Sequence, residues 1–133
     1  MNNSIFKILF ILIALNYYLL SYGNEYTYGT PVDSKWYGTY IMSEDDQGIK
    51  SDIKIVVDEQ GITLSSIVNG KQIYSATMTN DMMIKVSDNI YKNKTVIKNG
   101  QAVYIEFIFT DTAVTMNNYT EGELINSFIL EKE

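Results

Sequence analysis

The residue types that most often carry catalysis are scarce in this chain of 133 residues. It contains no histidine and no cysteine, which excludes the usual general base, thiolate chemistry, disulfides and cysteine metal sites. Carboxylates, lysines and hydroxyls remain, but their spacing indicates no catalytic pair. Glu106 interrupts an apolar stretch, and alternation places its side chain on the outer face with Tyr104. We therefore expect a protein that is not an enzyme and holds no cofactor.

The only dense acidic stretch is Glu44-Asp45-Asp46-Gln47-Gly48. A calcium loop supplies six or more oxygen ligands from alternating positions and a distant bidentate glutamate. This stretch lacks both features, so we interpret it as a solvated turn and expect no metal site.

The formal net charge is −6, and all ten basic residues are lysines. Without arginine the chain cannot make bidentate contacts to phosphate. An acidic surface also repels nucleic acid and anionic membranes. We therefore expect no nucleic-acid partner. Heavy use of Asn, Ile and Lys without Arg is associated with AT-rich genomes, which favours a bacterial source.

The N-terminal segment is typical of a signal peptide. Ile8–Leu20 is apolar except at Asn16 and would form a helix of about 20 Å, whereas a bilayer core is about 30 Å thick. Small residues at Ser21 and Gly23 suit a signal peptidase, and without cysteine no lipid can be attached. We predict a signal peptide over 1–23, a linker over 24–33 and one domain over 34–133. The mature protein would be periplasmic or secreted without a membrane span; the alternative is an uncleaved N-terminal anchor.

The remainder of the chain has the pattern of a β-protein. Turn signals separate short stretches rich in Ile, Val, Thr, Tyr and Phe. Asn-Gly pairs at 69–70 and 99–100 favour two-residue hairpins, because both positions need positive φ. The expected strands are 35–44, 49–58, 62–68, 72–79, 82–87, 90–98, 101–110, 113–119 and 123–131. The fold class is therefore all-β, an eight- or nine-stranded antiparallel meander that closes as a small barrel or, alternatively, forms a β-sandwich.

Alternation also assigns each strand an inner face. The clearest pattern is that of 101–110, where Val103, Ile105, Phe107 and Phe109 are expected to point inward. In three weaker segments we expect Met82, Ile84, Val86, Ile97 and Leu124 to point inward.

The stretch Trp36-Tyr37-Gly38-Thr39-Tyr40 is similar to the first strand of lipocalin-like small barrels, the calycin group that includes avidins and fatty-acid-binding proteins. The resemblance covers the first strand in sequence and the rest as architecture. Ser34 stands where lipocalins usually have glycine, and their flanking helix and later arginine are not visible. The resemblance implies a small lipocalin- or avidin-like barrel that Trp36 closes at one end and that binds a small apolar molecule.

Polar residues on the expected inner face are candidate ligand-binding positions. Together with Trp36 they are Tyr40, Tyr74, Tyr91, Asn93, Asn118 and Asn126. Ligand sites are mostly apolar with a few placed polar groups, which is the composition here. The alternative is that these groups hydrogen-bond to one another or to buried water.

The expected outer face suggests a second function. Tyr104, Ile108, Ile125 and Ile129 would form an exposed apolar patch if the last strands lie together, and such patches mark interfaces. One hypothesis is an exported, non-enzymatic binding protein with a small apolar ligand in its barrel. The other is a solid β-domain that acts through its surface, as an interaction or structural protein of the cell envelope, with a second copy or an envelope protein as partner.

Overall fold

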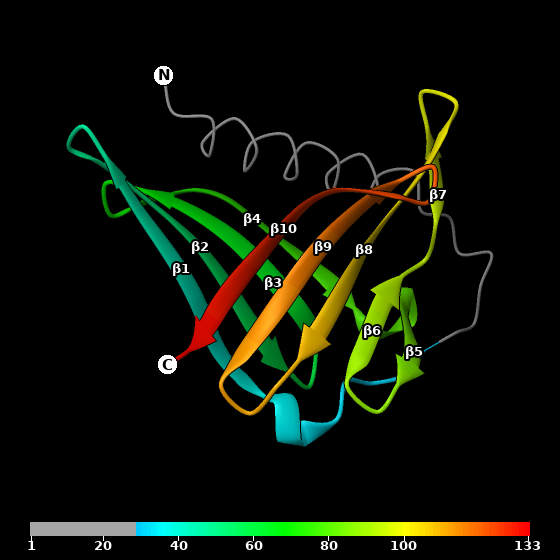
Figure 1. The fold of residues 1–133 in the computed structure, drawn as a ribbon. Helices are drawn as coiled ribbons and strands as arrows, with labels where there is room; N and C mark the ends of the chain where they lie inside the picture. The colour runs from blue at the N-terminus through cyan, green and yellow to red at the C-terminus, as the bar shows by residue number, and fades with distance from the viewer. Residues whose placement is uncertain (1–28) are drawn as a thin grey trace.

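The computed structural model describes residues 29–133. The predicted signal peptide, 1–23, and the linker residues 24–28 lie outside this range. Within it, no helix is long and apolar enough to cross a bilayer. The strands are β1 (Gly38–Asp46), β2 (Ile49–Asp58), β3 (Gly61–Val68), β4 (Lys71–Thr79), β5 (Met83–Ser87), β6 (Ile90–Asn93), β7 (Val96–Lys98), β8 (Gln101–Phe109), β9 (Ala113–Thr120) and β10 (Glu123–Lys132), with 3₁₀ turns η1 (Ser34–Trp36) and η2 (Asn80–Met82) (Figure 1).

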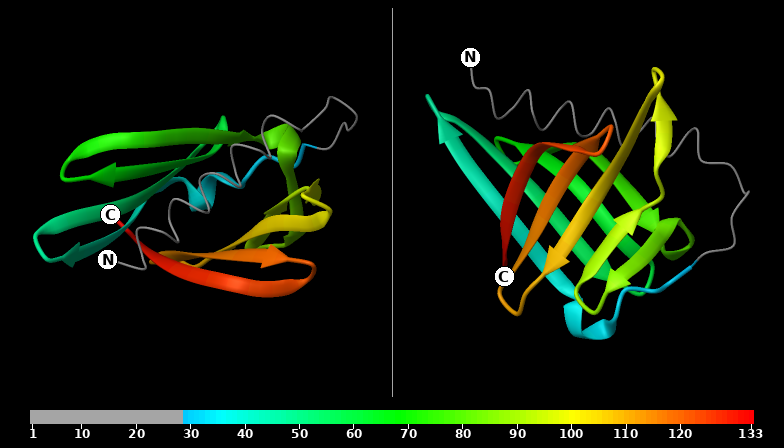
Figure 2. Two further views of the ribbon diagram at one scale, coloured as in Figure 1. Left: turned by 90° about the horizontal axis from the view of Figure 1, so that it is seen from above. Right: turned by 45° about the vertical axis from the view of Figure 1, so that its right-hand side comes forward.

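All ten strands belong to one antiparallel sheet. Its order is β4-β3-β2-β1-β10-β9-β8-β6-β5, and β7 pairs with β8 beside this path. The sheet curls strongly, so that β2–β4 lie opposite β8–β10 (Figure 2). The edge strands are β4 and β5, and no ladder joins them in the described part of the chain. The predicted all-β antiparallel meander is confirmed, in the form of a half-barrel.

Two walls meet where β1 contacts β10. These strands pair only at Tyr40↔Lys132 and Ile41↔Glu131, and the Glu133 amide donates to the Thr39 carbonyl at 2.8 Å. Beyond these pairs the strands diverge, as Figure 1 shows. We call β1–β4 the N-terminal wall and β5–β10 the C-terminal wall.

Four two-residue turns lie at one end of the half-barrel, uppermost in Figure 1. They are 47–48, 69–70, 99–100 and 121–122, and all eight residues have positive φ. The hairpin geometry predicted for the two Asn-Gly pairs is therefore confirmed, and Gln47-Gly48 and Glu121-Gly122 adopt the same conformation. We call this the four-turn end, and the opposite end, which η1 covers, the Trp36 end.

The core lies on the concave side of the sheet. Alternation correctly predicts the inward residues Ile105, Phe107 and Phe109 of β8, which are at most 5% exposed. The largest side chains that are almost fully buried are Tyr40, Tyr91, Phe107, Phe109, Ile55, Ile62, Leu64, Met78, Met83 and Met116. Most of them lie nearer the Trp36 end.

The first predicted strand begins too early. Residues 34–36 form η1, because the Trp36 amide donates to the Asp33 carbonyl at 2.9 Å and the Tyr37 amide donates to the Ser34 carbonyl at 3.1 Å. Trp36 therefore precedes the strand. The predicted strand 90–98 is two strands, separated by Lys94 and Thr95.

Three predictions of inward-facing residues are wrong. In β5 the buried residue is Met83, whereas Val86 is 52% exposed, because η2 delays the start of the strand. Leu124 is 53% exposed, since the β9–β10 ladder shifts register between Leu124 and Asn126. Ile97 is 68% exposed, because the break before β7 interrupts the alternation.

Candidate functional site

An aromatic cluster fills the Trp36 end of the concave side. The Trp36 ring stacks on Phe109 with centroids 5.6 Å apart, and Tyr40 and Tyr91 contact Phe109 edge-on at 5.9 and 5.8 Å. The Tyr40 hydroxyl donates to the Trp36 carbonyl at 2.7 Å, and burial raises the pKa of Tyr40. Three of the predicted ligand-binding residues, Trp36, Tyr40 and Tyr91, therefore form packed core.

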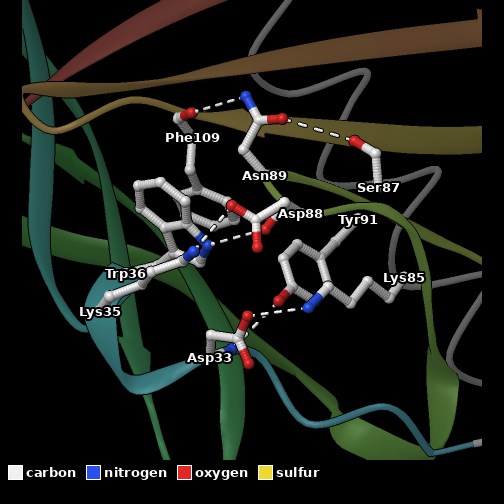
Figure 3. Close-up of polar contacts among 9 residues, drawn as sticks. All are labelled: Asp33, Lys35, Trp36, Lys85, Ser87, Asp88, Asn89, Tyr91 and Phe109. Carbon is white, nitrogen blue, oxygen red and sulfur yellow. Dashed lines mark hydrogen bonds and ion pairs between the residues drawn. The ribbon is translucent and has the colours of Figure 1, made fainter.

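Polar contacts hold the segment around η1 against the β5–β6 hairpin (Figure 3). Asp33 pairs with Lys85 at 2.8 Å and Lys35 with Asp88 at 2.7 Å. The Trp36 Nε1 donates to the Asp88 carbonyl at 3.3 Å. The hydrogen bond from Lys85 lowers the pKa of Asp33, and the same bond raises the pKa of Lys85. These contacts close the Trp36 end.

The amide of Asn93 is fully buried and bonded on both sides. Its Oδ1 accepts from the Ile105 backbone amide at 2.9 Å, and its Nδ2 contacts the Met78 sulfur at 3.2 Å. At the break between β6 and β7, the Asn93 side chain thus supplies the acceptor for a backbone amide of β8. Asn93, another predicted ligand residue, is bonded within the core.

Polar side chains replace apolar ones toward the four-turn end. Asn118 and Asn126 are half-buried, and the Nδ2 of Asn118 donates to the Oδ1 of Asn126 at 3.1 Å. On the other wall, burial raises the pKa of Tyr74. The Oγ of Ser51 is buried without a hydrogen-bond partner among the described residues. The interior is therefore more polar here than around Trp36.

A hollow of about 140 Å³ lies at the four-turn end of the C-terminal wall. Its lining includes Lys98, Gln101, Val103, Asn118, Thr120 and Ile125. Val103 pairs with Thr120, and the neighbouring Ile105 pairs with Asn118, so three lining residues share the inward parity of β8 and β9. Of the predicted ligand residues, Asn118 lines this hollow and Asn126 is bonded to Asn118.

Sequence reasoning missed most of the lining. Val103 was expected inward as core, and the Asn-Gly turn at 99–100 was interpreted only as a hairpin. The available signal was the change along β9 from Val114 and Met116 to Asn118 and Thr120 at inward positions. That change indicates where the apolar core ends.

Of the predicted patch, Tyr104, Ile108 and Ile129 share the convex parity of the C-terminal wall, whereas Ile125 stands at the register shift of β10 and lines the hollow. Ile125 and Ile129 are 51% and 63% exposed, while Tyr104 and Ile108 are half-buried. Tyr104 stacks on Tyr119 at 4.8 Å. Burial, followed by the nearby Glu106 carboxylate, raises the pKa of Tyr119.

Residues 29–133 contain no group of three His, Cys, Asp or Glu side chains that could hold a metal ion. The hollow presents amide, hydroxyl and aliphatic groups together with the ammonium group of Lys98. In comparisons with protein-family models, curated proteins and solved structures, nothing matched this chain.

Proposed function

We propose that the chain is a non-enzymatic binding protein that holds a small, mainly apolar molecule in the hollow at its four-turn end. The hollow itself carries this proposal, since it combines an aliphatic lining from Val103 and Ile125 with the polar groups of Asn118 and Thr120. A few polar groups in an apolar lining are typical of small-molecule sites. The packed aromatic cluster at the other end argues against a ligand beside Trp36.

The volume limits the ligand. A cavity of about 150 Å³ holds one benzene molecule, and the hollow has about 140 Å³. The ligand would therefore be one ring or a short branched chain, of about six to ten non-hydrogen atoms. Because Asn118 uses its Nδ2 on Asn126, its Oδ1 is the group that would accept from a ligand hydroxyl or N–H.

The proposal includes a small calycin-type barrel. Support comes from the antiparallel half-barrel and from Trp36, which is 7% exposed and covers one end of the core.

The proposal also includes export, which rests on the segment 1–23. Intact mass of the protein from its own host tests export: we expect cleavage after Gly23 and no acyl chain, whereas retention of 1–23 would favour an anchor.

Ligand binding can be tested by NMR. We expect phenol, benzyl alcohol and indole to shift the amide signals of Asn118, Thr120 and Ile125 in the ¹⁵N-labelled protein. Val103→Phe should abolish these shifts by filling the hollow. Ile97→Phe, a change at an exposed position outside the hollow, should leave them intact. Absence of any shift, together with a ligand-free native mass, would refute the proposal.

A further inference from the structure

The convex face of the C-terminal wall is ordered in three rows that run across the strands. The strand register defines their members. The first row is Ile90, Ile108, Thr115 and Ile129; the second is Lys92, Glu106, Asn117 and Ser127; the third is Tyr104, Tyr119 and Leu124. One polar row therefore lies between two apolar rows, and we call these residues the striped face.

Three of the four residues of the polar row are already hydrogen-bonded within the chain, and the Nζ of the fourth, Lys92, lies 4.9 Å from the centre of the Tyr104 ring. Glu106 Oε1 accepts from Asn117 Nδ2 at 3.2 Å and from the Tyr119 hydroxyl at 3.5 Å. Ser127 Oγ donates to Asn117 Oδ1 at 2.6 Å. Covering polar groups is costly when they lose their partners, and these groups would keep theirs. These three residues can therefore be covered by another surface at a small cost.

The striped face also differs in charge from the chain as a whole. It contains one lysine and one glutamate, so its formal charge is zero, whereas the whole chain has −6. A second acidic molecule of the same kind can approach this face without local repulsion. In addition, Leu124 and Ile129 are more than half exposed on β10.

The convex face of the N-terminal wall is different. There, neighbouring strands are linked by hydroxyl pairs, Thr63 with Thr77 at 2.8 Å and Ser65 with Ser75 at 3.2 Å. Small hydroxyl side chains present little apolar area to a partner. At these positions the N-terminal wall therefore lacks the apolar rows that make the striped face suited to contact.

We infer that the striped face is the interface of a symmetric dimer with a second copy of this chain. Two sheets can stack face to face with their strands roughly aligned. A two-fold axis parallel to the strands places each row opposite the same row of the second copy, with the residues of that row in reverse order. Ile90 then faces Ile129 of the second copy, and Lys92 faces Ser127.

The charges select this orientation. An axis along the rows would place Lys92 opposite Lys92 and Glu106 opposite Glu106, and like charges in contact are unfavourable. With the axis parallel to the strands, Glu106 faces the amide of Asn117 instead. The face is therefore self-complementary in one of the two arrangements.

The area indicates a weak dimer. Four strands about 4.8 Å apart and three rows about 6.8 Å apart span roughly 20 Å by 20 Å. Two such faces bury on the order of 800 Å², which is less than the roughly 1,200 Å² of stable interfaces and falls in the range of weak, transient ones. The dimer should therefore form at micromolar concentrations or above and dissociate on dilution.

Sedimentation equilibrium over a concentration series tests the dimer. We expect reversible dimerisation of the unmodified protein and, for Ile129→Lys, a dissociation constant at least roughly tenfold higher, because two lysines would be desolvated. The matched control is Ile73→Lys, at an exposed position of β4 in the other wall, with circular dichroism to verify folding. A protein that stays monomeric at every concentration, or equal weakening by both changes, would overturn the inference.

Two changes at Ser127 test the orientation. Both remove the hydroxyl donor, but Ser127→Glu places a carboxylate opposite Lys92 and Ser127→Lys places a like charge there. We expect the glutamate to tighten the dimer by roughly two- to tenfold and the lysine to weaken it by a similar factor. With the axis along the rows, residue 127 would face itself and both changes would weaken the dimer. That result would overturn the proposed arrangement.

Discussion

At the Trp36 end of the interior, three aromatic rings pack around Phe109, and every inward polar group discussed above is bonded within the chain. At the four-turn end, the inward residues include Asn118, Thr120 and Ser51, and a hollow lies beside the first two. Both ends belong to the same strands, so the difference arises from the side chains chosen along each strand. One end supplies stability, and the binding that we propose uses the other.

In this proposal, stability and binding therefore depend on different parts of one sheet. Because the core around Phe109 holds the walls together, the four-turn end can carry half-buried amides with little risk to the fold. The same division predicts that one kind of substitution changes the stability by different amounts at the two ends.

The largest effect should follow removal of the ring at Trp36. Trp36→Ala deletes the partner of Phe109 and opens a cavity, which typically costs about 3–5 kcal/mol. Domains of this size have a total stability of about 5–15 kcal/mol, so the variant should be marginal at 37 °C. Urea denaturation measures the loss.

Tyr37→Ala is the control for that change. Its side chain is only half-buried at the edge of the core, so we expect a loss nearer about 1 kcal/mol. Equal losses at the two positions would contradict the assignment of Trp36 as the closing residue.

Two glycines provide a second contrast. Gly61, at the Trp36 end, has φ of +134°, and an added Cβ would overlap the Met78 carbonyl oxygen. Gly100, at the four-turn end, has φ of +75° and open space around it. Gly61→Ala should therefore cost about 3 kcal/mol or more from strain and overlap.

Gly100→Ala should cost only the left-handed backbone penalty, about 1–2 kcal/mol. Thermal unfolding of both variants, beside the unmodified protein, measures the difference. If Gly100→Ala proves the more damaging change, the four-turn end is less tolerant than we infer.

Two asparagines sharpen the comparison further. Asn93→Ala leaves the buried Ile105 amide without its acceptor, so we expect a loss of about 1–3 kcal/mol. Asn118→Ala acts on a half-buried amide that solvent can reach, and should cost less than about 1 kcal/mol. Only Asn118→Ala should weaken ligand binding, as measured by the NMR titration. The reverse pattern would place the functional group in the core.

Much of the fold could be predicted from the sequence because alternation and turn residues are local signals. The long alternation in β8 and the Asn-Gly turns required no knowledge of distant contacts. The errors at Val86 and Leu124 arose where a 3₁₀ turn or a register shift changes parity, and neither leaves a clear local pattern. Asn118 and Asn126 could be placed inward, but their mutual bond depends on that register shift, and so does the position of Ile125 at the hollow.

The smallest effect concerns the ion pair of Asp33 and Lys85, which are both substantially solvent-exposed. The pKa of Asp33 is lowered from its ordinary 3.8, chiefly by the hydrogen bond from Lys85. The pair's contribution is therefore complete above pH 3.8 and lost as the pH falls through the lower pKa of the folded state. The pKa of Lys85 is raised from 10.5, so the contribution is also lost as the pH rises beyond that value. Asp33→Asn and Lys85→Met should each flatten the same acid-side decline of the melting temperature, by an amount that salt reduces. Unchanged slopes in both variants would show that this contact positions the η1 segment without contributing to pH-dependent stability.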